Sequence, residues 1–346
     1  MQKKIAFYIS DHNMEHVLRT IPILQNMLKM EENLEIFIKS GKKQIRMVKE
    51  WVKERNRIHF YELEMKDEDK SCWEEMSDTE AVFLKNNQIG LIISDICPWV
   101  FLAADALRIK SLLIANYTWA ELCETEEDRE DYLSCYELAS RIFIYDFHRP
   151  ELTGYGVEYE LMSMINRFYD MNRIESIREQ MGEQIVFVDL PKVKLETSSG
   201  MEKEGKTIDV SRFPYQFVIT AETPFSGDNV IVLTEGEKER HNYVAASKFV
   251  IADVSWNAIA EVVLSNKKAA FAVKEKLSSS RWMLDLLKER GQCIELRRDM
   301  WLDMESLLNE LENFCYSYDH EYYNSDYDMA KQIIFAYPEK RRRNRS

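Results

Sequence analysis

The side chains best suited to chemistry lie together in one short segment near the start of the chain. His12 and His16 are separated by three residues, Glu15 lies between them, and Arg19 follows three residues later. The run His-x-x-Glu-His is the arrangement with which inverzincin metalloproteases bind zinc. That chemistry requires both histidines one turn apart inside a helix and a third protein ligand, whereas His12 falls at a predicted turn. We therefore keep a zinc peptidase only as an alternative and predict neither a metal nor a cofactor.

This segment follows the first of a series of short apolar runs that alternate with amphipathic stretches of helical spacing. The predicted strands are 5–10, 34–38, 58–63, 91–95, 111–115 and 141–145, and then 184–189, 215–220, 229–233, 249–252 and 269–273. Such alternation is typical of βαβ units and parallel sheets. We predict an α/β protein with two Rossmann-like, doubly wound domains.

The predicted domains have definite boundaries. The N-terminal domain covers 1–150, a helical connection without strands covers 151–181, and the C-terminal domain covers 182–302. Closing helices cover 303–338 and a basic tail covers 339–346. Because open parallel sheets bind ligands at the carboxyl ends of their strands, we expect the two domains to face each other across a ligand-binding cleft.

Composition narrows the class of protein. The chain has 346 residues, with 46 basic and 60 acidic side chains and a net charge of −14, which disfavours general binding to nucleic acid. No apolar run reaches the roughly 20 residues needed to span a bilayer, and the N-terminal apolar run is too short for a signal peptide. Six scattered cysteines without a Cys-x-x-Cys pair indicate reduced thiols. We expect a cytoplasmic protein.

Three segments of the first predicted domain carry a family resemblance. His12, His16 and Arg19 match a Gly-His-x-x-Gly-His-x-x-Arg loop, although Asp11 and Glu15 occupy its two glycine positions and Asn13 stands where a further glycine is expected. The run 93–98 is similar to a Val-Ser-Asp-x-x-Pro turn, and 114–119 is similar to an Asn-Phe-Ser/Thr-Trp segment. The chain thereby resembles GT-B glycosyltransferase-like proteins, including the N-terminal half of L-arabinokinase and peptidoglycan N-acetylglucosaminyltransferase-type proteins.

A weaker resemblance occurs in the second predicted domain. The run 249–261 looks like the donor-site strand of that family followed by its Gly-x-Gly-Thr-x-x-Glu helix start, of which only Glu261 is kept. Ser255 and Asn257 stand in the glycine positions. Glycine allows the backbone N–H groups of a helix start to approach a pyrophosphate closely, so these side chains obstruct the usual mode of binding.

The resemblance implies roles for nine residues. The first domain would hold an unidentified acceptor and the second a nucleotide-sugar donor, such as a UDP-sugar, in an inverting, metal-independent hexosyltransferase-type reaction. The implied roles are a catalytic base at His16 or else His12, an orienting carboxylate at Asp95, substrate binding by Arg19, Asn116 and Trp119, and donor binding by Ser255, Asn257 and Glu261. The alternative is an inactive pseudo-glycosyltransferase that acts as a binding or scaffold subunit with a protein partner or a second copy of itself. In that case the polar groups of residues 10–19 would only cap the first helix.

Overall fold

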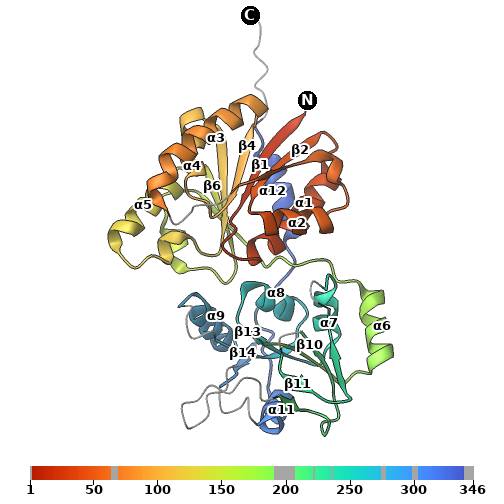
Figure 1. Ribbon diagram of the computed structural model, residues 1–346. Coiled ribbons are helices and arrows are strands. Elements are labelled where there is room, and N and C mark those ends of the chain that lie inside the picture. The colour runs from red at the N-terminus through yellow and green to blue at the C-terminus, as the bar shows by residue number, and fades with distance from the viewer. Residues whose placement is uncertain are drawn as a thin grey trace, which may run out of the picture. The chain divides into compact units, whose positions relative to one another are not determined.

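The chain folds into two compact units, which Figure 1 shows as ribbons. The computed structural model describes residues 2–63, 69–190, 207–220, 223–234, 237–273, 278–297 and 303–338. The first unit comprises Met1–Asn166 and Tyr323–Ser346, and the second comprises Arg167–Tyr322. The predicted basic tail, 339–346, lies outside the described residues.

The first unit is built on a seven-stranded parallel sheet of order β3-β2-β1-β4-β5-β6-β7. The strands are β1 Lys3–Ile9, β2 Leu34–Ser40, β3 Ile58–Glu62, β4 Leu91–Asp95, β5 Lys110–Ala115, β6 Arg141–Tyr145 and β7 Tyr159–Met162. The central strands are nearly continuous apolar runs because helices bury both of their faces. The strand order reverses between β1 and β4, and such a switch point is where doubly wound sheets bind ligands.

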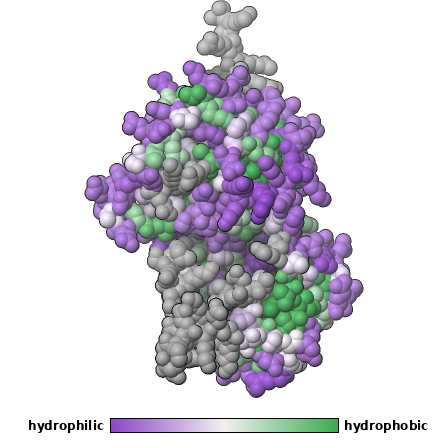
Figure 2. Space-filling model, viewed as in Figure 1, coloured by the Kyte–Doolittle hydropathy of each residue, from purple (hydrophilic) through white to green (hydrophobic). Residues whose placement is uncertain are grey.

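Helices cover both faces of this sheet (Figure 1). They are α1 Glu15–Met30, α2 Lys42–Trp51, α3 Trp73–Asn87, α4 Val100–Leu107, α5 Glu126–Tyr136 and α12 Asp326–Ala336, with short 3-10 turns η1 Arg55–Arg57, η2 Lys70–Cys72, η3 Trp119–Glu121 and η4 Pro150–Gly154. The buried rings of Trp73, Trp99 and Tyr136 belong to one core with Ala6 and Ile92 of the sheet. On the visible side of this unit, hydrophilic residues predominate at the surface (Figure 2).

The second unit repeats the same architecture on a six-stranded parallel sheet of order β12-β10-β8-β13-β14-β15. Its strands are β8 Ile185–Asp189, β10 Gln216–Ile219, β12 Val230–Val232, β13 Phe249–Asp253, β14 Lys268–Ala272 and β15 Cys293–Glu295, and β9 Ile208–Asp209 pairs with β11 Phe225–Ser226 beside them. Its helices are α6 Met171–Met181, α7 Arg240–Ala246, α8 Trp256–Leu264, α9 Ser278–Glu289 and α11 Met304–Asn313. The switch point lies between β8 and β13. The prediction of two Rossmann-like, doubly wound domains is therefore confirmed.

Two details differ from the sequence-based expectation. The connection 151–181, predicted to lack strands, contains β7, which pairs with β6 at the edge of the first sheet. Four residues of mixed exposure are too short a run to show the alternation that identifies a strand. The closing segment 303–338 is divided between the units, because α11 belongs to the second and α12 to the first.

In the described parts of the chain, no helix is both long enough and apolar enough to cross a membrane.

Candidate functional site

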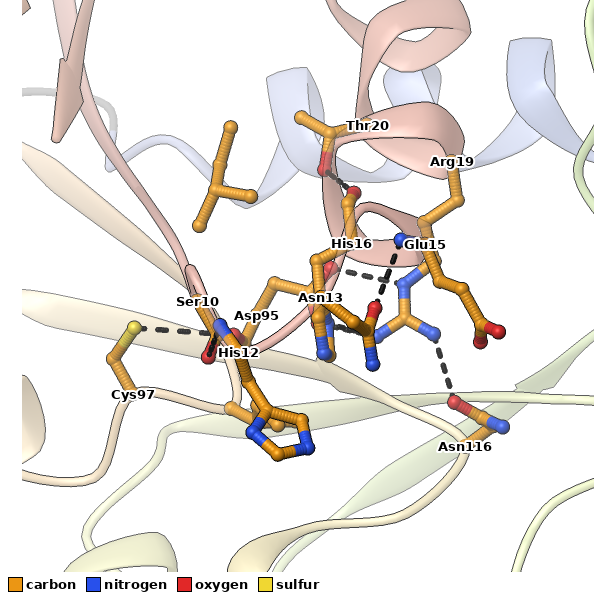
Figure 3. Close-up of polar contacts among 12 residues, drawn as sticks. Ser10, His12, Asn13, Glu15, His16, Arg19, Thr20, Asp95, Cys97 and Asn116 are labelled. Carbon is orange, nitrogen blue, oxygen red and sulfur yellow. Dashed lines mark hydrogen bonds and ion pairs between the residues drawn. The ribbon is translucent and has the colours of Figure 1, made fainter. Parts of the chain in front are cut away.

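Polar side chains from three elements converge at the switch point of the first sheet (Figure 3). Asp95 is the last residue of β4, and Asn116 directly follows β5. His16 and Arg19 lie three residues apart in the first turns of α1, so they share one face of that helix. All four side chains are buried, with at most 1% of any of these residues exposed.

The Arg19 guanidinium ties these elements together. Its Nε donates to Asp95 Oδ2 at 2.9 Å, its Nη2 donates to Asp95 Oδ1, and its Nη1 donates to Asn116 Oδ1 at 2.7 Å. Burial by itself would raise the pKa of Asp95, but Arg19 and then His16 outweigh that effect and lower it. Asp95 is therefore a carboxylate at neutral pH. Arg19 was predicted to bind substrate, but its three guanidinium nitrogens all donate to side chains of the protein.

His16 forms a dyad with the same carboxylate. Its Nδ1 lies 2.9 Å from Asp95 Oδ1, which can only accept, and 2.9 Å from Arg19 Nη2, which can only donate. The tautomer with its proton on Nδ1 donates to Asp95, and the tautomer with its proton on Nε2 accepts from Arg19. The other ring nitrogen, Nε2, has no hydrogen-bond partner among the described residues. In the tautomer that donates to Asp95, Nε2 carries a free lone pair. Burial lowers the pKa of His16, Asp95 opposes this, and Arg19 adds to it, so the ring is neutral at pH 7. An oriented neutral imidazole of this kind can act as a general base.

His12 and Trp119 lie in the loops that follow β1 and β5. The exposed His12 ring meets the buried Trp119 ring edge to face, with 4.8 Å between their centroids. Glu121 holds the Trp119 turn in place, because its carboxylate accepts hydrogen bonds from the backbone N–H of Thr118 at 2.5 Å and from the hydroxyl of Tyr155. Sequence reasoning missed Glu121 and Tyr155, whose pairing depends on segments 34 residues apart.

The His-x-x-Glu-His spacing does not place both histidines in one helix. Helix α1 begins at Glu15, and His12 lies in the bend that precedes it. Among the residues that the structure describes, no group of three or more His, Cys, Asp or Glu side chains could hold a metal ion.

The three predicted donor-site residues lie at the switch point of the second sheet, around the start of α8. Ser255 is the N-cap, and its Oγ accepts a hydrogen bond from the backbone N–H of Ala258 at 3.1 Å. Asn257 and Glu261 lie four residues apart on the same face of α8. Glu261 is only 3% exposed, and burial raises its pKa even though Arg240 and Arg167 oppose the rise.

Two arginines that sequence reasoning missed surround Glu261. Arg240 Nη1 lies 2.8 Å from Glu261 Oε2, and Arg167 Nη2 lies 3.7 Å from Glu261 Oε1. Arg240 Nη2 also pairs with Asp189 Oδ2 at 2.8 Å, at the carboxyl end of β8. Asp189 could have been suspected because it ends a predicted strand. The arginines carried no comparable signal, since Arg167 precedes the second unit's sheet and Arg240 begins a short helix.

Comparison with known proteins adds information about the fold. No protein-family model matches the chain, and no curated protein matches its sequence. Solved structures that are similar include the spinosyn forosaminyltransferase SpnP, with 13% identity, a TM-score of 0.60 and coverage of 98% of this chain and 100% of that one. MurG from Acinetobacter baumannii has 10% identity, a TM-score of 0.62 and coverage of 96% and 99%. UGT89C1 from Arabidopsis thaliana in complex with UDP has 9% identity, a TM-score of 0.62 and coverage of 97% and 100%.

These likenesses extend over nearly the whole chain and over nearly the whole of each matched chain. They show that the protein has the fold of GT-B glycosyltransferases, and the resemblance found in the sequence motifs is confirmed at that level.

Proposed function

We propose that this protein is a glycosyltransferase that moves a sugar from a nucleotide-sugar to a hydroxyl group of an acceptor. The single observation that carries the proposal is the Asp95–His16 dyad at the switch point of the first sheet, 2.9 Å between Oδ1 and Nδ1, with Nε2 left without a partner in the described structure. A buried polar atom of this kind calls for an explanation, and an unused lone pair on an oriented imidazole is suited to proton removal.

In the proposed reaction, His16 Nε2 removes the proton of the acceptor hydroxyl while the oxygen attacks the anomeric carbon of the donor sugar. The bond from that carbon to the nucleoside diphosphate breaks on the opposite face, so the configuration inverts and the bonding electrons leave with the diphosphate. Asp95 stabilises the imidazolium that forms, and the proton then passes to solvent. The chemistry is metal-independent in this proposal.

The remaining predicted residues have supporting roles in the proposal. Arg19 and Asn116 fix the dyad, while His12 and Trp119 line the acceptor side. Ser255, Asn257 and Glu261 belong to the donor side. SpnP is a forosaminyltransferase and UGT89C1 forms a complex with UDP, and both support a nucleotide-sugar donor such as a UDP-sugar.

One observation favours a second function, a non-catalytic binding or scaffold subunit with a protein partner or a second copy of the chain. The helix start that would hold a donor is occupied, because Ser255 Oγ accepts the backbone N–H of Ala258 and Glu261 is engaged by Arg240. A protein that had lost catalysis would need no open donor site.

The test begins with thermal shifts against UDP-, dTDP-, CDP- and GDP-sugars, because a ligand that binds the folded state raises its stability by mass action. With the donor so identified, release of the nucleoside diphosphate is measured for the wild type and for His16→Asn, and the anomeric configuration of the product is read by NMR. Asn can still donate to Asp95 but has no counterpart of Nε2, so we expect turnover to fall by about 10² to 10⁴.

The matched control is His320→Gln, which changes an exposed histidine of the second unit and should leave turnover unchanged. Equal turnover of His16→Asn and the wild type would refute the role of the dyad. Failure of every nucleotide-sugar to shift the melting temperature, together with a co-purifying partner, would favour the binding subunit.

A further inference from the structure

The proposed chemistry leaves one charged cluster of the second unit unexplained. It comprises Arg240, Arg167, Glu261 and Asp189, and it lies at the switch point between β8 and β13. Arg240 bridges the two carboxylates with contacts of 2.8 Å to each, while Arg167 approaches Glu261 at 3.7 Å. The guanidinium of Arg240 also lies over the Phe187 ring, 5.2 Å from its centroid.

The linker before α6 holds Arg167 in this position. Tyr169 donates its hydroxyl to the backbone carbonyl of Glu261 at 3.0 Å, and His241 Nε2 donates to the backbone carbonyl of Phe168 at 3.0 Å. Arg167 itself donates from Nη1 to the backbone carbonyl of Lys238. These three hydrogen bonds fix the segment that carries Arg167 against α7 and α8.

The cluster also contains unused hydrogen-bonding capacity. Arg240 Nε and Asn257 Nδ2 are buried donors without a partner among the described residues, and His241 Nδ1 is a buried acceptor in the same condition. Buried polar groups are normally satisfied, so the open donor of Arg240 within the cluster, together with that of Asn257 one turn before Glu261 on α8, indicates a ligand that accepts hydrogen bonds.

The start of α8 is poorly suited to bind an anion through its backbone. Ser255 Oγ already accepts the N–H of Ala258, and the side chains of Ser255 and Asn257 keep a ligand at a distance that glycine would not impose. Arginine, in contrast, binds phosphate oxygens in a bidentate manner with charge-assisted hydrogen bonds.

We propose that Arg240 and Arg167 bind the diphosphate group of a nucleoside diphosphate, and that this diphosphate displaces the Glu261 carboxylate, which occupies the arginines in the empty protein. The inference deepens the proposed function, since the ligand is the nucleotide part of its donor. Glu261 is then a competitor of the diphosphate for the two cations, and its release makes it free to meet the sugar.

The inference predicts opposite effects for two substitutions at one ion pair. Glu261→Gln keeps the shape of the side chain but removes the competing negative charge, so the affinity for UDP should rise about tenfold. Arg240→Gln removes the cation and should lower that affinity at least tenfold. If Glu261 instead held hydroxyl groups of the ligand directly, the first substitution would weaken binding.

The experiment is isothermal titration calorimetry of the full chain with UDP, dTDP, CDP and GDP, and then with the monophosphate of whichever nucleotide binds. In the wild type the diphosphate should bind more tightly than the monophosphate, and in Arg240→Gln that difference should disappear. Arg167→Gln, whose contact is longer, provides a second variant with a smaller loss in case Arg240→Gln does not fold. The control is Arg212→Gln, which removes an exposed arginine paired with Glu305 at 3.4 Å in the same unit and should change nothing.

The inference is overturned if Glu261→Gln leaves the affinity unchanged or lowers it, if Arg240→Gln and Arg167→Gln both bind like the wild type, or if neither the wild type nor Glu261→Gln binds any nucleotide. The first two outcomes leave the proposed function intact, because calorimetry measures binding and the test of His16→Asn measures turnover. The third outcome would also count against the nucleotide-sugar donor and would favour the binding subunit. A glycosyltransferase that binds its donor without these arginines would keep the proposed function and refute this inference alone.

Discussion

Apart from the extra edge strand β7, the two sheets have the same strand order around their switch points. The two switch points differ in how far their arginine–carboxylate clusters are enclosed by the protein. In the first unit, Arg19 and Asp95 are both 1% exposed, and the Arg19 guanidinium donates its hydrogen bonds to side chains of the protein. In the second, the side chains of Arg240 and Asp189 are 21% and 38% exposed, whereas that of Glu261 is only 4% exposed. A closed cluster can orient a catalytic group but cannot exchange partners. A cluster that still meets solvent can accept a ligand, and this difference separates the positioning role proposed for the first site from the binding role proposed for the second.

The largest expected effect that distinguishes them is on stability. Asp95→Ala would leave Arg19 buried without its carboxylate, and loss of one partner of a buried pair typically costs about 3 to 5 kcal/mol. Glu261→Ala would leave Arg240 paired with Asp189, so we expect a loss of about 1 to 2 kcal/mol, the size of a lost charged hydrogen bond. Both values are measured as changes in the free energy of unfolding in urea.

An exposed ion pair supplies the control for that measurement. Asp285→Ala removes the partner of Arg281 at the surface, where such pairs contribute at most about 1 kcal/mol. If Asp95→Ala cost no more than Asp285→Ala, the first cluster would not be the closed structural unit described above, and the contrast between the two sites would fail.

A smaller effect is expected on the free energy of unfolding at acidic pH, through the buried His241 of the second unit. Burial first, and then Arg167 and Arg240, lower the pKa of His241 to about 3, although its hydrogen bond to Phe168 opposes this. The unfolded chain binds a proton at this ring below about pH 6.5 while the folded protein does not until about pH 3, so the free energy of unfolding decreases as the pH falls through this window. At pH 5 the loss from His241 should be about 2 kcal/mol relative to pH 8.

His241→Gln tests this, because a Gln amide can still donate to the carbonyl of Phe168 but does not titrate. Urea unfolding at pH 8 and pH 5 should show a decrease that is smaller by about 2 kcal/mol in the variant than in the wild type. His320→Gln should retain the full decrease. A decrease of equal size in His241→Gln and the wild type would mean that the second cluster does not exclude the charged imidazole.

How much of this could be predicted from the sequence depends on how locally each feature is encoded. Strand β4 was predicted to the residue, because this fully buried parallel strand begins with the apolar run Leu-Ile-Ile, whereas the short edge strand β7 has no such pattern. The association of His16 with Asp95 was implied only by the family resemblance, because the order of the strands that brings their ends together is not encoded locally. The arginines around Glu261 could not be predicted, because ion pairs between side chains up to 94 residues apart leave no mark in the local sequence.

The smallest expected effect tests why the second site lacks glycine. Ser255→Gly restores the residue type expected at this helix start, and the loss of the cap should cost only a few tenths of a kcal/mol. If the arginines carry the diphosphate, freeing the backbone N–H of Ala258 should change the affinity for UDP by less than about threefold, well below the effect of Glu261→Gln. Calorimetry on both variants gives the comparison directly. A tenfold gain in Ser255→Gly, with no gain in Glu261→Gln, would show that the helix start is the anion site, and the second switch point would then differ from the first only in an obstructing side chain.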